Sequence, residues 1–320
     1  MHTSYAGLLR RELSLRNATY AATLGLPHVT TYGDMPVIVY RPSVEERRHG
    51  NFLEPSYESI LDHSAWRRRL DKVHAQARRS LPRSEECWKE LDSSTSSDAL
   101  LMNVFCCPPV AQNPTIALKL GFDVCEVPDF GFRARIPRVD GHVDRTEIDM
   151  KLGTLLAESK LTETGFQTQR PTIVESYRDL DTVFDRELLP RLNQQYVSYQ
   201  LIRNVLAAYH LGLGFCVLLD ARRPDLMEAW FAIMRCVRIA ELRTKCKVLT
   251  WQELAEILPQ ELQHFLDQKY GIVPPGCTPS PCDSDISYVE QGTARMLGGD
   301  SGGQSYDCGN DRESPVFSDE

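Results

Sequence analysis

The stretch that decides the fold reads Thr146-Glu147-Ile148-Asp149-Met150-Lys151-Leu152-Gly153-Thr154-Leu155-Leu156-Ala157-Glu158-Ser159-Lys160. Polar and apolar residues alternate before Gly153 and an apolar run follows it, which predicts two short strands joined near that glycine. Strand alternation puts Asp149 on one face of the first strand with Glu147 and Lys151. It likewise puts Glu158 and Lys160 together on the second strand. If the strands pair antiparallel, we expect Asp149 and Glu158 within reach of one divalent ion.

This pair of acids has the chemistry of a phosphodiesterase site. Magnesium prefers oxygen ligands, keeps waters, and is typically held by one or two carboxylates plus a substrate phosphate. A bound cation lowers the pKa of a water and stabilises the pentavalent phosphate. Lys160 is placed to orient or activate that water and to offset charge on the phosphate. The alternative is a structural salt-bridge ladder that joins Glu158 and Lys160 to a neighbouring strand.

An acid-x-Lys triple is a weak signal by itself, because average composition gives about two by chance in a chain of this length. This sequence has three such triples, and Asp267-x-Lys269 lies in a helical pattern, where we expect solvated surface. The triples ending in Lys151 and Lys160 lie in apolar strands, where an unpaired charge is costly unless it serves a metal or a partner. Only the strand triples are therefore candidates for chemistry.

The flanking patterns predict an order of helix, three strands, helix and strand. Short helices are expected near Leu8–Leu15, at Asp98–Phe105 and at Thr115–Leu120, followed by strands at Phe130–Ile136, Thr146–Leu152 and Thr154–Leu161. A long helix at Asn193–His210, closed by glycines, precedes the apolar run Phe215–Leu219, which fits a buried strand. Packing helices are expected at Pro224–Arg243 and from the capping box Thr250-x-x-Glu253 to Gly271.

A helix expected at Ser64–Ser80 carries a strongly basic face. Trp66, Leu70, Val73 and Ala77 recur at helical spacing, and Arg67, Arg68 and Arg69 are among the basic residues that cover the rest. Contact with a nucleic-acid backbone would release counterions and favour binding without reading sequence. A solvated helix face is the alternative, and it is slightly favoured.

The 320-residue chain is 42% hydrophobic and 25% charged, values of an ordinary globular protein. Residues 274–320 hold nine acids and two bases, so they account for -7 of the net charge of -8. This segment is rich in Pro, Gly and Ser without apolar periodicity, and it is expected to be a disordered acidic tail. The near-neutral remainder does not exclude a nucleic-acid partner.

Other protein classes are excluded by missing signals. The longest apolar stretch, Leu211–Leu219, is far short of a membrane span, and the N-terminus lacks the apolar core of a signal peptide. A cytoplasmic protein without a membrane partner is therefore expected. The ten cysteines form no CxxC pair, so reduced thiols are favoured over a structural metal. The absence of a glycine-rich phosphate loop argues against a nucleotide-driven motor or a dinucleotide enzyme.

The order of elements and the motif Glu158-Ser159-Lys160 resemble the PD-(D/E)xK nuclease superfamily. The chain looks most like a bacterial group of restriction-endonuclease-like proteins of unassigned specificity, over roughly residues 60–273. Matching motifs include Ser96-Ser97-Asp98-Ala99, Thr146-x-x-Asp149, Glu158-Ser159-Lys160-Leu161-Thr162-Glu163, Tyr199-Gln200-Leu201-Ile202-Arg203-Asn204 and Lys269-Tyr270-Gly271. The resemblance implies an α/β fold with an αβββαβ core, in which helices flank a mixed central sheet and further helices lie at both ends. It also implies a metal-dependent DNA phosphodiesterase.

Carried over position by position, Asp149 and Glu158 match the metal-binding acids and Lys160 the catalytic lysine. On the long helix Gln200, Arg203 and Asn204 fall at i, i+3 and i+4, one polar stripe suited to face the sheet edge and the scissile phosphate. Helix-surface hydrogen bonding is the alternative for this stripe.

Further matches are looser. Gln195-x-x-x-Tyr199 fits weakly an element of RecB-like nucleases, and Ile148 replaces the proline of the superfamily name. Glu147 is an extra acid that is either a third ligand or a surface charge. The acid that many relatives carry on a preceding helix has no clear match, and Asp98 is the candidate for it.

The sequence thus predicts an N-terminal extension (1–60), a nuclease-like domain (61–273) and the tail (274–320), the last able to compete with DNA for the basic face. The predicted function is a DNA endonuclease of restriction or repair type that depends on Mg²⁺ or, alternatively, Mn²⁺. Asp149, Glu158, Lys160 and Gln200 are the catalytic candidates, and Arg203, Asn204, Arg67, Arg68 and Arg69 the substrate-binding ones. Alternatives are a catalytically silent nuclease-fold module that binds DNA or protein, and an unrelated α/β protein with structural charges. DNA is the expected partner, and a homodimer that cuts both strands is an option.

Overall fold

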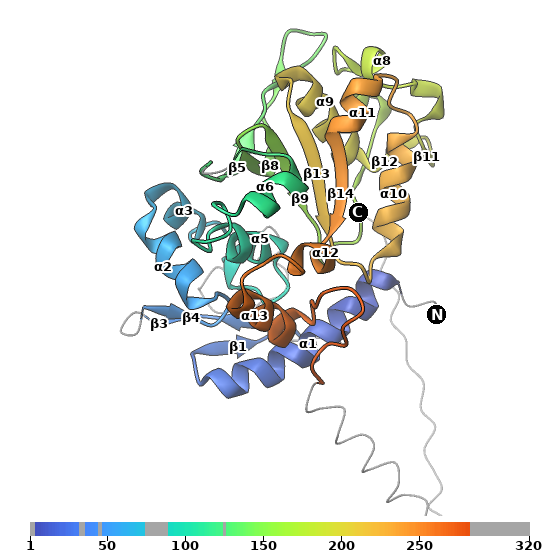
Figure 1. Cartoon of the computed structure of the whole chain (residues 1–320). Helices are drawn as coiled ribbons and strands as arrows, with labels where there is room; N and C mark the ends of the chain where they lie inside the picture. Colours follow the sequence, from blue (N-terminus) through green and yellow to red (C-terminus); the bar gives the residue numbers. More distant parts are fainter. Residues whose placement is uncertain (1–3, 32–35, 44–46, 74–88, 124–125, 282–320) are drawn as a thin grey trace, which may run out of the picture. The chain divides into compact units, whose positions relative to one another are not determined.

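The computed structural model describes residues 4–31, 36–43, 47–73, 89–123 and 126–281 (Figure 1). Most of the predicted acidic tail, from residue 282 on, lies outside the described residues. The helix predicted at Ser64–Ser80 ends at Arg69, residues 70–73 are not helical, and residues beyond 73 lie outside the described ones. Residues 1–282 belong to one compact unit. No described helix is both long enough and apolar enough to cross a membrane.

A five-stranded mixed sheet forms the centre of this unit. Its strands in spatial order are β14 (Cys246–Thr250), β13 (Gly214–Leu219), β9 (Leu155–Ser159), β8 (Glu147–Leu152) and β5 (Asp129–Arg133). β13 runs parallel to β14 and to β9, whereas β8 is antiparallel to both β9 and β5. The predicted meander of three strands and the later buried strand are therefore confirmed.

The β8–β9 hairpin is built as the sequence predicts. Gly153 has a positive φ of 53°, a conformation that costs glycine little, and it lets the chain reverse between Leu152 and Leu155. The paired register extends from there to Met150 opposite Ala157. Asp149 and Glu158 come directly after this last pair, at the open end of the hairpin.

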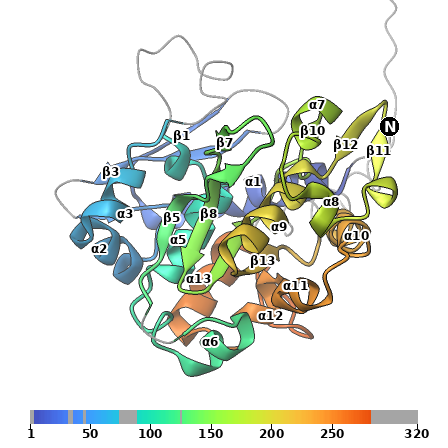
Figure 2. The ribbon, with the colours of Figure 1, turned by 90° about the horizontal axis from the view of Figure 1, so that it is seen from above.

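Alternation along β13 creates two hydrophobic cores, one on each face of the sheet. Cys216 and Leu218 belong to one core, while Phe215, Val217 and Leu219 belong to the other. Helix α9 (Tyr199–Leu211) and helix α10 (Pro224–Met234) cover the second face, and α5 (Ser97–Phe105) covers the first (Figures 1 and 2). The predicted αβββαβ order is thus present.

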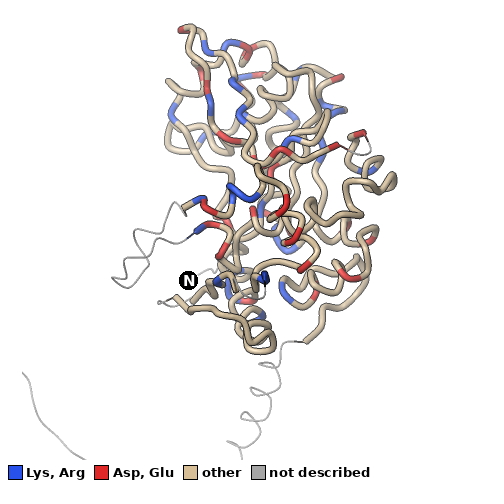
Figure 3. The backbone as a smooth tube through the Cα atoms, turned by 90° about the vertical axis from the view of Figure 1, so that its left-hand side faces the viewer, with Lys and Arg blue, Asp and Glu red and all other residues tan. Residues whose placement is uncertain are grey.

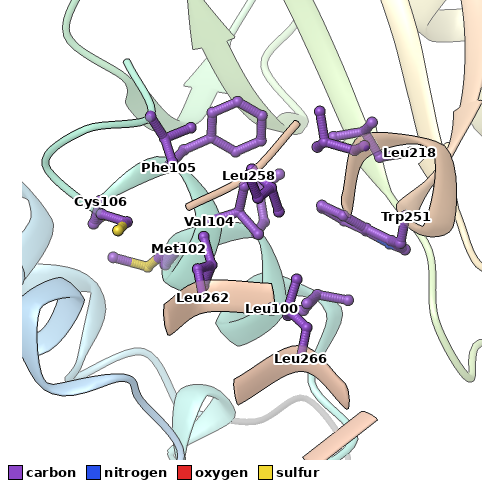
Figure 4. Close-up of a cluster of buried hydrophobic side chains, with 14 of the residues drawn as sticks. Leu100, Met102, Val104, Phe105, Cys106, Leu218, Trp251, Leu258, Leu262 and Leu266 are labelled. Atoms are coloured by element: carbon purple, nitrogen blue, oxygen red, sulfur yellow. The ribbon is translucent and has the colours of Figure 1, made fainter. Parts of the chain in front are cut away.

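The first core joins α5 to the C-terminal helices α12 (Trp251–Ala255) and α13 (Gln260–Tyr270). Figure 4 shows Leu100 and Val104 of α5 facing Leu262 and Leu266 of α13, with Trp251 beside them. Fully burying one such large apolar side chain stabilises the fold by about 1.5–3 kcal/mol. This core thus packs α5, which precedes the sheet, against α12 and α13.

The N-terminal helix packs onto the C-terminal helix α13. Helix α1 (Tyr5–Leu24) lies along α13, and its buried side chains include Leu9 and Leu13 (Figure 1). Helices α2 (Glu54–Asp62) and α3 (Ser64–Arg69) follow, with α3 beside β5. The remaining short elements are β1 (His28–Thr30), β2 (Ile38–Tyr40), β3 (Pro42–Ser43), β4 (Arg48–His49), η1 (Glu90–Asp92), α6 (Pro114–Leu120), β6 (Ile136–Pro137), β7 (Val143–Asp144), β10 (Thr168–Gln169), α7 (Pro171–Val174), α8 (Leu180–Val183), η2 (Arg186–Leu188), β11 (Arg191–Leu192), β12 (Gln195–Val197) and α11 (Ala240–Lys245).

The long helix begins later than predicted. Residues that were expected in its first turns form the β11–β12 hairpin, in which Leu192 pairs with Gln195. Asn193 and Gln194 both have positive φ, the geometry of a two-residue hairpin turn. The predicted Gln195-x-x-x-Tyr199 element is therefore not one helical face, because Gln195 lies in a strand and Tyr199 begins α9.

The two packing helices are each divided. The predicted Pro224–Arg243 helix is α10 and α11, with a non-helical connection between them, and the strand β14 after it was not predicted. The capping box at Thr250 is confirmed, but α12 ends at Ala255 and α13 starts after Pro259. Proline disfavours helical backbone at the residue before it, which is why one continuous helix is not formed.

The prediction that the Asp267-x-Lys269 triple is solvated surface is wrong for Lys269. Its exposed fraction is 0%, and its Nζ donates to Asn17 Oδ1 at 2.6 Å. The rings of Tyr20, Tyr40 and Tyr270 surround it, at 5.3, 4.3 and 5.3 Å from Nζ. The helical spacing was correct, but the packing of α1 on α13 covers the face on which Lys269 lies.

Charges of both signs and free thiols are found among the described residues. Lys and Arg are interspersed with Asp and Glu along the described chain (Figure 3). Every cysteine within the described ranges is a free thiol, which agrees with the expected reduced state. The described residues thus include no disulfide.

Candidate functional site

Glu158 and Lys160 form a buried ion pair at the end of β9. Their exposed fractions are 1% and 5%, and Lys160 Nζ donates to Glu158 Oε1 at 2.6 Å. The sheet extends to this point, because Lys160 N–H donates to Leu218 O on β13. A buried charge is tolerated when it is paired and hydrogen bonded, as both charges are here.

Asp149 lies beside this pair at the first position beyond the β8–β9 register. Its Oδ2 accepts a hydrogen bond of 2.8 Å from Ser159 N–H, so its carboxylate replaces a strand carbonyl as the acceptor. Burial, then repulsion by Glu158 and by Asp98, raises the pKa of Asp149 well above its usual value. The structure thus brings the two predicted ligand acids together, and a cation beside them would offset the repulsion that raises the pKa of Asp149.

Lys160 is held in its charged form. Burial by itself would lower the pKa of this ammonium, but Glu158, Glu163 and Asp149 outweigh burial and raise the pKa above its usual value. Glu163 is itself fixed, since it accepts hydrogen bonds from Ser97 Oγ and from Leu161 N–H. In this arrangement Lys160 is a donor and a positive charge rather than a base.

The polar stripe on α9 divides into two parts. Asn204 Nδ2 donates to Glu158 Oε2 at 2.9 Å, and Arg203 donates to Asn204 Oδ1 through Nε at 3.1 Å and Nη2 at 3.0 Å. Both side chains are buried and bind protein groups. Gln200 is half-buried, and within the described part of the chain its side chain makes no hydrogen bond.

A second buried cluster, which the sequence did not reveal, adjoins Arg203. The Asp144 carboxylate accepts from Tyr177, whose hydroxyl lies 2.7 Å from that of Tyr199. Arg203 lies over the Tyr199 ring at 5.9 Å, and Arg138 reaches Asp144 at 3.6 Å. Tyr199 and Arg203 both lie on α9, but Asp144, Tyr177 and Arg138 come from other segments, so no local spacing could have indicated the whole cluster.

The predicted basic face is split between an inward and an outward side. Arg69 pairs with Asp98 at 2.9 Å and with Glu147 at 3.2 Å, and Lys72 contacts the same Asp98 oxygen at 3.2 Å. Arg67 and Arg68 are exposed and line a surface hollow of about 310 Å³. The lining of this hollow is completed by Leu61, Asp62, Ser64 and Asp71.

The residues at the end of the hairpin fit a small hard cation in the nature of their donors. Within the described ranges no group of three or more His, Cys, Asp or Glu side chains is arranged to hold a metal. Asp149 and Glu158 remain as oxygen donors, and Mg²⁺ is commonly bound by one or two carboxylates together with water and phosphate oxygens. Glu147 already binds Arg69 and Arg133, so it does not join them as a third acid here.

Comparison with known proteins gives one match. The family model described as a restriction endonuclease associating with ARP matches residues 26–271, which is most of the chain. No curated protein and no solved structure matches. The matched region contains the whole central sheet and the Asp149, Glu158 and Lys160 cluster. The chain therefore belongs to this restriction endonuclease family.

Proposed function

We propose that this protein hydrolyses DNA phosphodiester bonds in a metal-dependent reaction at the open end of the β8–β9 hairpin. The observation that carries the proposal is the buried Glu158–Lys160 pair beside Asp149, in a chain that belongs to a restriction endonuclease family. Titratable groups with strongly perturbed pKa values gather at functional sites.

Asp149 and Glu158 are the proposed ligands of Mg²⁺, with Mn²⁺ as the substitute. When bound, such an ion lowers the pKa of a water and stabilises charge on the phosphate. The two carboxylates are already in place, because Asp149 is held by Ser159 N–H and Glu158 by Lys160 and Asn204. Preorganised ligands need little rearrangement, and this favours binding.

Lys160 is proposed to act as a cation. Since the neighbouring carboxylates raise its pKa, its ammonium keeps its protons and can donate to the attacking water or to a phosphate oxygen. A donor that is fixed before the reaction is worth about 3–4 kcal/mol of transition-state stabilisation in related chemistry. Lys160 would therefore orient the water and offset charge rather than remove a proton.

Contact with the DNA backbone is proposed for the outward side of α3. Arg67 and Arg68 are exposed, whereas Arg69 binds Asp98 and Glu147. Exposed guanidinium groups suit phosphate contacts that carry affinity without sequence specificity. Gln200 is the member of the α9 stripe that is free to reach a substrate, because Arg203 and Asn204 are engaged with protein groups.

Cleavage of supercoiled plasmid by the full chain tests this function. With Mg²⁺ we expect nicked or linear product that disappears with a chelator, and Asp149→Ala and Lys160→Ala should each lower the rate by at least about 100-fold. The matched control is Lys151→Ala, which removes a lysine from the other strand triple, where it faces the Phe132 ring.

Two outcomes would contradict the proposal. Cleavage that persists equally in Asp149→Ala and Lys160→Ala would exclude this site. Tight DNA binding without metal and without cleavage would instead favour a catalytically silent binding module. A cytoplasmic location and a homodimer stay predictions, and light scattering of the purified chain with and without DNA will decide the second.

A further inference from the structure

The two acids of the proposed site lie just beyond the paired part of the β8–β9 hairpin. The β8–β9 ladder ends at Met150 opposite Ala157, one residue before Asp149 and Glu158. Beyond that pair, β8 stays paired with β5 and β9 with β13, and two sets of side-chain contacts link β8 to β9. One is the hydrogen bond from Ser159 N–H to Asp149 Oδ2, and the other comes from helix α9.

Helix α9 bridges the open end of the hairpin through two consecutive residues. Arg203 Nη2 donates to the carbonyl of Glu147 on β8 at 3.1 Å. The same guanidinium holds Asn204, and Asn204 in turn holds Glu158 on β9 at 2.9 Å. A continuous path of hydrogen bonds therefore runs from β8 to β9 across the point where the backbone ladder stops.

The direction of the Asn204 amide follows from this path. Arginine has only donors, so the Asn204 atom that faces its Nε and Nη2 must be the carbonyl oxygen. The NH₂ group must then face Glu158, as the 2.9 Å contact requires. Arg203 thus keeps the Asn204 amide from turning its oxygen toward a carboxylate, which would be repulsive.

The path is rigid because both residues are enclosed. Their exposed fractions are 3% for Arg203 and 0% for Asn204, and the Tyr199 ring lies beside the guanidinium. Tyr199 is hydrogen bonded to Tyr177, which donates to Asp144. Neighbouring hydrogen bonds in such a network fix each other's geometry.

We propose that Arg203 and Asn204 are positioning residues that set the separation of the Asp149 and Glu158 carboxylates and thereby tune the affinity of the site for a divalent cation. The inference rests on the proposed function, since it concerns the same two acids. Partners that orient a metal ligand change metal affinity by about 10–100-fold when they are removed. Neither residue touches substrate in this role.

Calorimetric titration of Mn²⁺ into the full chain without DNA tests the inference. Asn204→Leu keeps the size of the side chain but removes the donor to Glu158, and we expect the Kd for Mn²⁺ to rise by about 10–100-fold. Asn51→Leu is the matched control. Asn51 is an equally buried amide, and its Nδ2 donates to the carbonyls of Leu91 and Ser93 rather than to Glu158. This control should leave the Kd of the folded protein unchanged.

A second variant and a selectivity measurement separate positioning from general loss of structure. Arg203→Lys keeps the positive charge but loses the planar fork that binds Asn204 and Glu147 together. Mg²⁺ demands near-ideal geometry whereas Ca²⁺ accepts flexible sites, so competition against Mn²⁺ should show a larger loss for Mg²⁺ than for Ca²⁺.

The possible failures are distinct. If the unmodified chain binds Mn²⁺ but Asn204→Leu and Arg203→Lys bind it equally well, the positioning inference is overturned and the proposed function stands. A second failure is that Asn204→Leu and Arg203→Lys lose affinity for Mg²⁺ and for Ca²⁺ to the same extent, and that the control Asn51→Leu loses as much. The role of both residues is then merely structural, and the inference is also overturned. If the unmodified chain binds no divalent ion, the proposed function fails and the inference fails with it.

Discussion

Two lysines of the same local pattern have opposite environments in this protein. Lys160 follows Glu158 and is surrounded by carboxylates, which raise its pKa, whereas Lys269 follows Asp267 and is surrounded by tyrosine rings. Burial lowers the pKa of Lys269 well below its usual value. A residue and its spacing therefore do not specify its charge; the groups that pack around it do.

The pH dependence of stability tests the state of Lys269. Because its folded pKa is lowered, the unfolded chain binds more protons between that pKa and about 10.4, so stability rises with pH across this window. Relative to Lys269→Met, the free energy of unfolding of the unmodified protein should increase from pH 7 to pH 10, by up to about 1.4 kcal/mol per pH unit. Urea denaturation of both proteins over this range is the measurement. A constant difference would mean that the tyrosine rings and Asn17 keep the lysine charged.

At the scale of elements, a glycine in β5 sets how closely α3 can approach the sheet. Gly131 has φ of +73°, and a Cβ built there would lie 2.2 Å from Arg69 Nη1. The absence of a side chain leaves room for the guanidinium that joins Asp98 of α5 to Glu147 of β8. Elements far apart in sequence are thus linked through one small residue.

Replacing this glycine should release the link. Gly131→Ala places the methyl group on Arg69, and displacement of the guanidinium leaves the carboxylates of Asp98 and Glu147 without that partner. Gly141→Ala is the control, since Gly141 has φ of +81° and open space at its Cβ position. Both substitutions share a backbone strain of about 1–2 kcal/mol. We expect chemical denaturation to show a further loss of about 1 kcal/mol for Gly131→Ala alone, and equal losses would contradict the link.

For the whole molecule, the two ends of the described chain form one packed assembly. Helix α1 lies on α13, and Asn17 of α1 donates to the backbone carbonyl of Lys269 at 3.1 Å. Arg16 donates to the carbonyl of Ser280 at 2.9 Å, which extends the contact beyond α13. The first residues therefore contribute to the same hydrophobic core as α5 and the C-terminal helices.

Truncation of a core leucine in α1 should consequently destabilise the whole unit. Leu13 is 0% exposed, and Leu13→Ala removes buried methyl groups, which typically costs about 2–5 kcal/mol. Leu15 lies two residues further in the same helix with 46% of its surface exposed, so Leu15→Ala should cost far less. Thermal unfolding followed at both far- and near-ultraviolet wavelengths would show one cooperative transition. Separate melting of α1 in Leu13→Ala would contradict an integral role.

Local patterns predicted much of the fold and the centre of the candidate site. Alternation predicted β8 and β9, and because a hairpin brings residues near in sequence together, the proximity of Asp149 to Glu158 and Lys160 was predictable too. The start of α9 was predicted too early, since residues that could continue a helix form β12 and pair with β10 and β11. Strand pairing with the adjacent β11 and the distant β10 thus overrode local helical preference.

The sequence by itself determined the αβββαβ order and the acids and lysine of the candidate site, because both depend on periodicity and on residues close together in the chain. Only the tertiary structure decided that Asn204 holds Glu158, that Arg69 is paired inward, and that Lys269 is buried. The physical reason is that each of these contacts joins segments many residues apart. Such contacts depend on how whole elements pack, and a one-dimensional pattern carries no record of that packing.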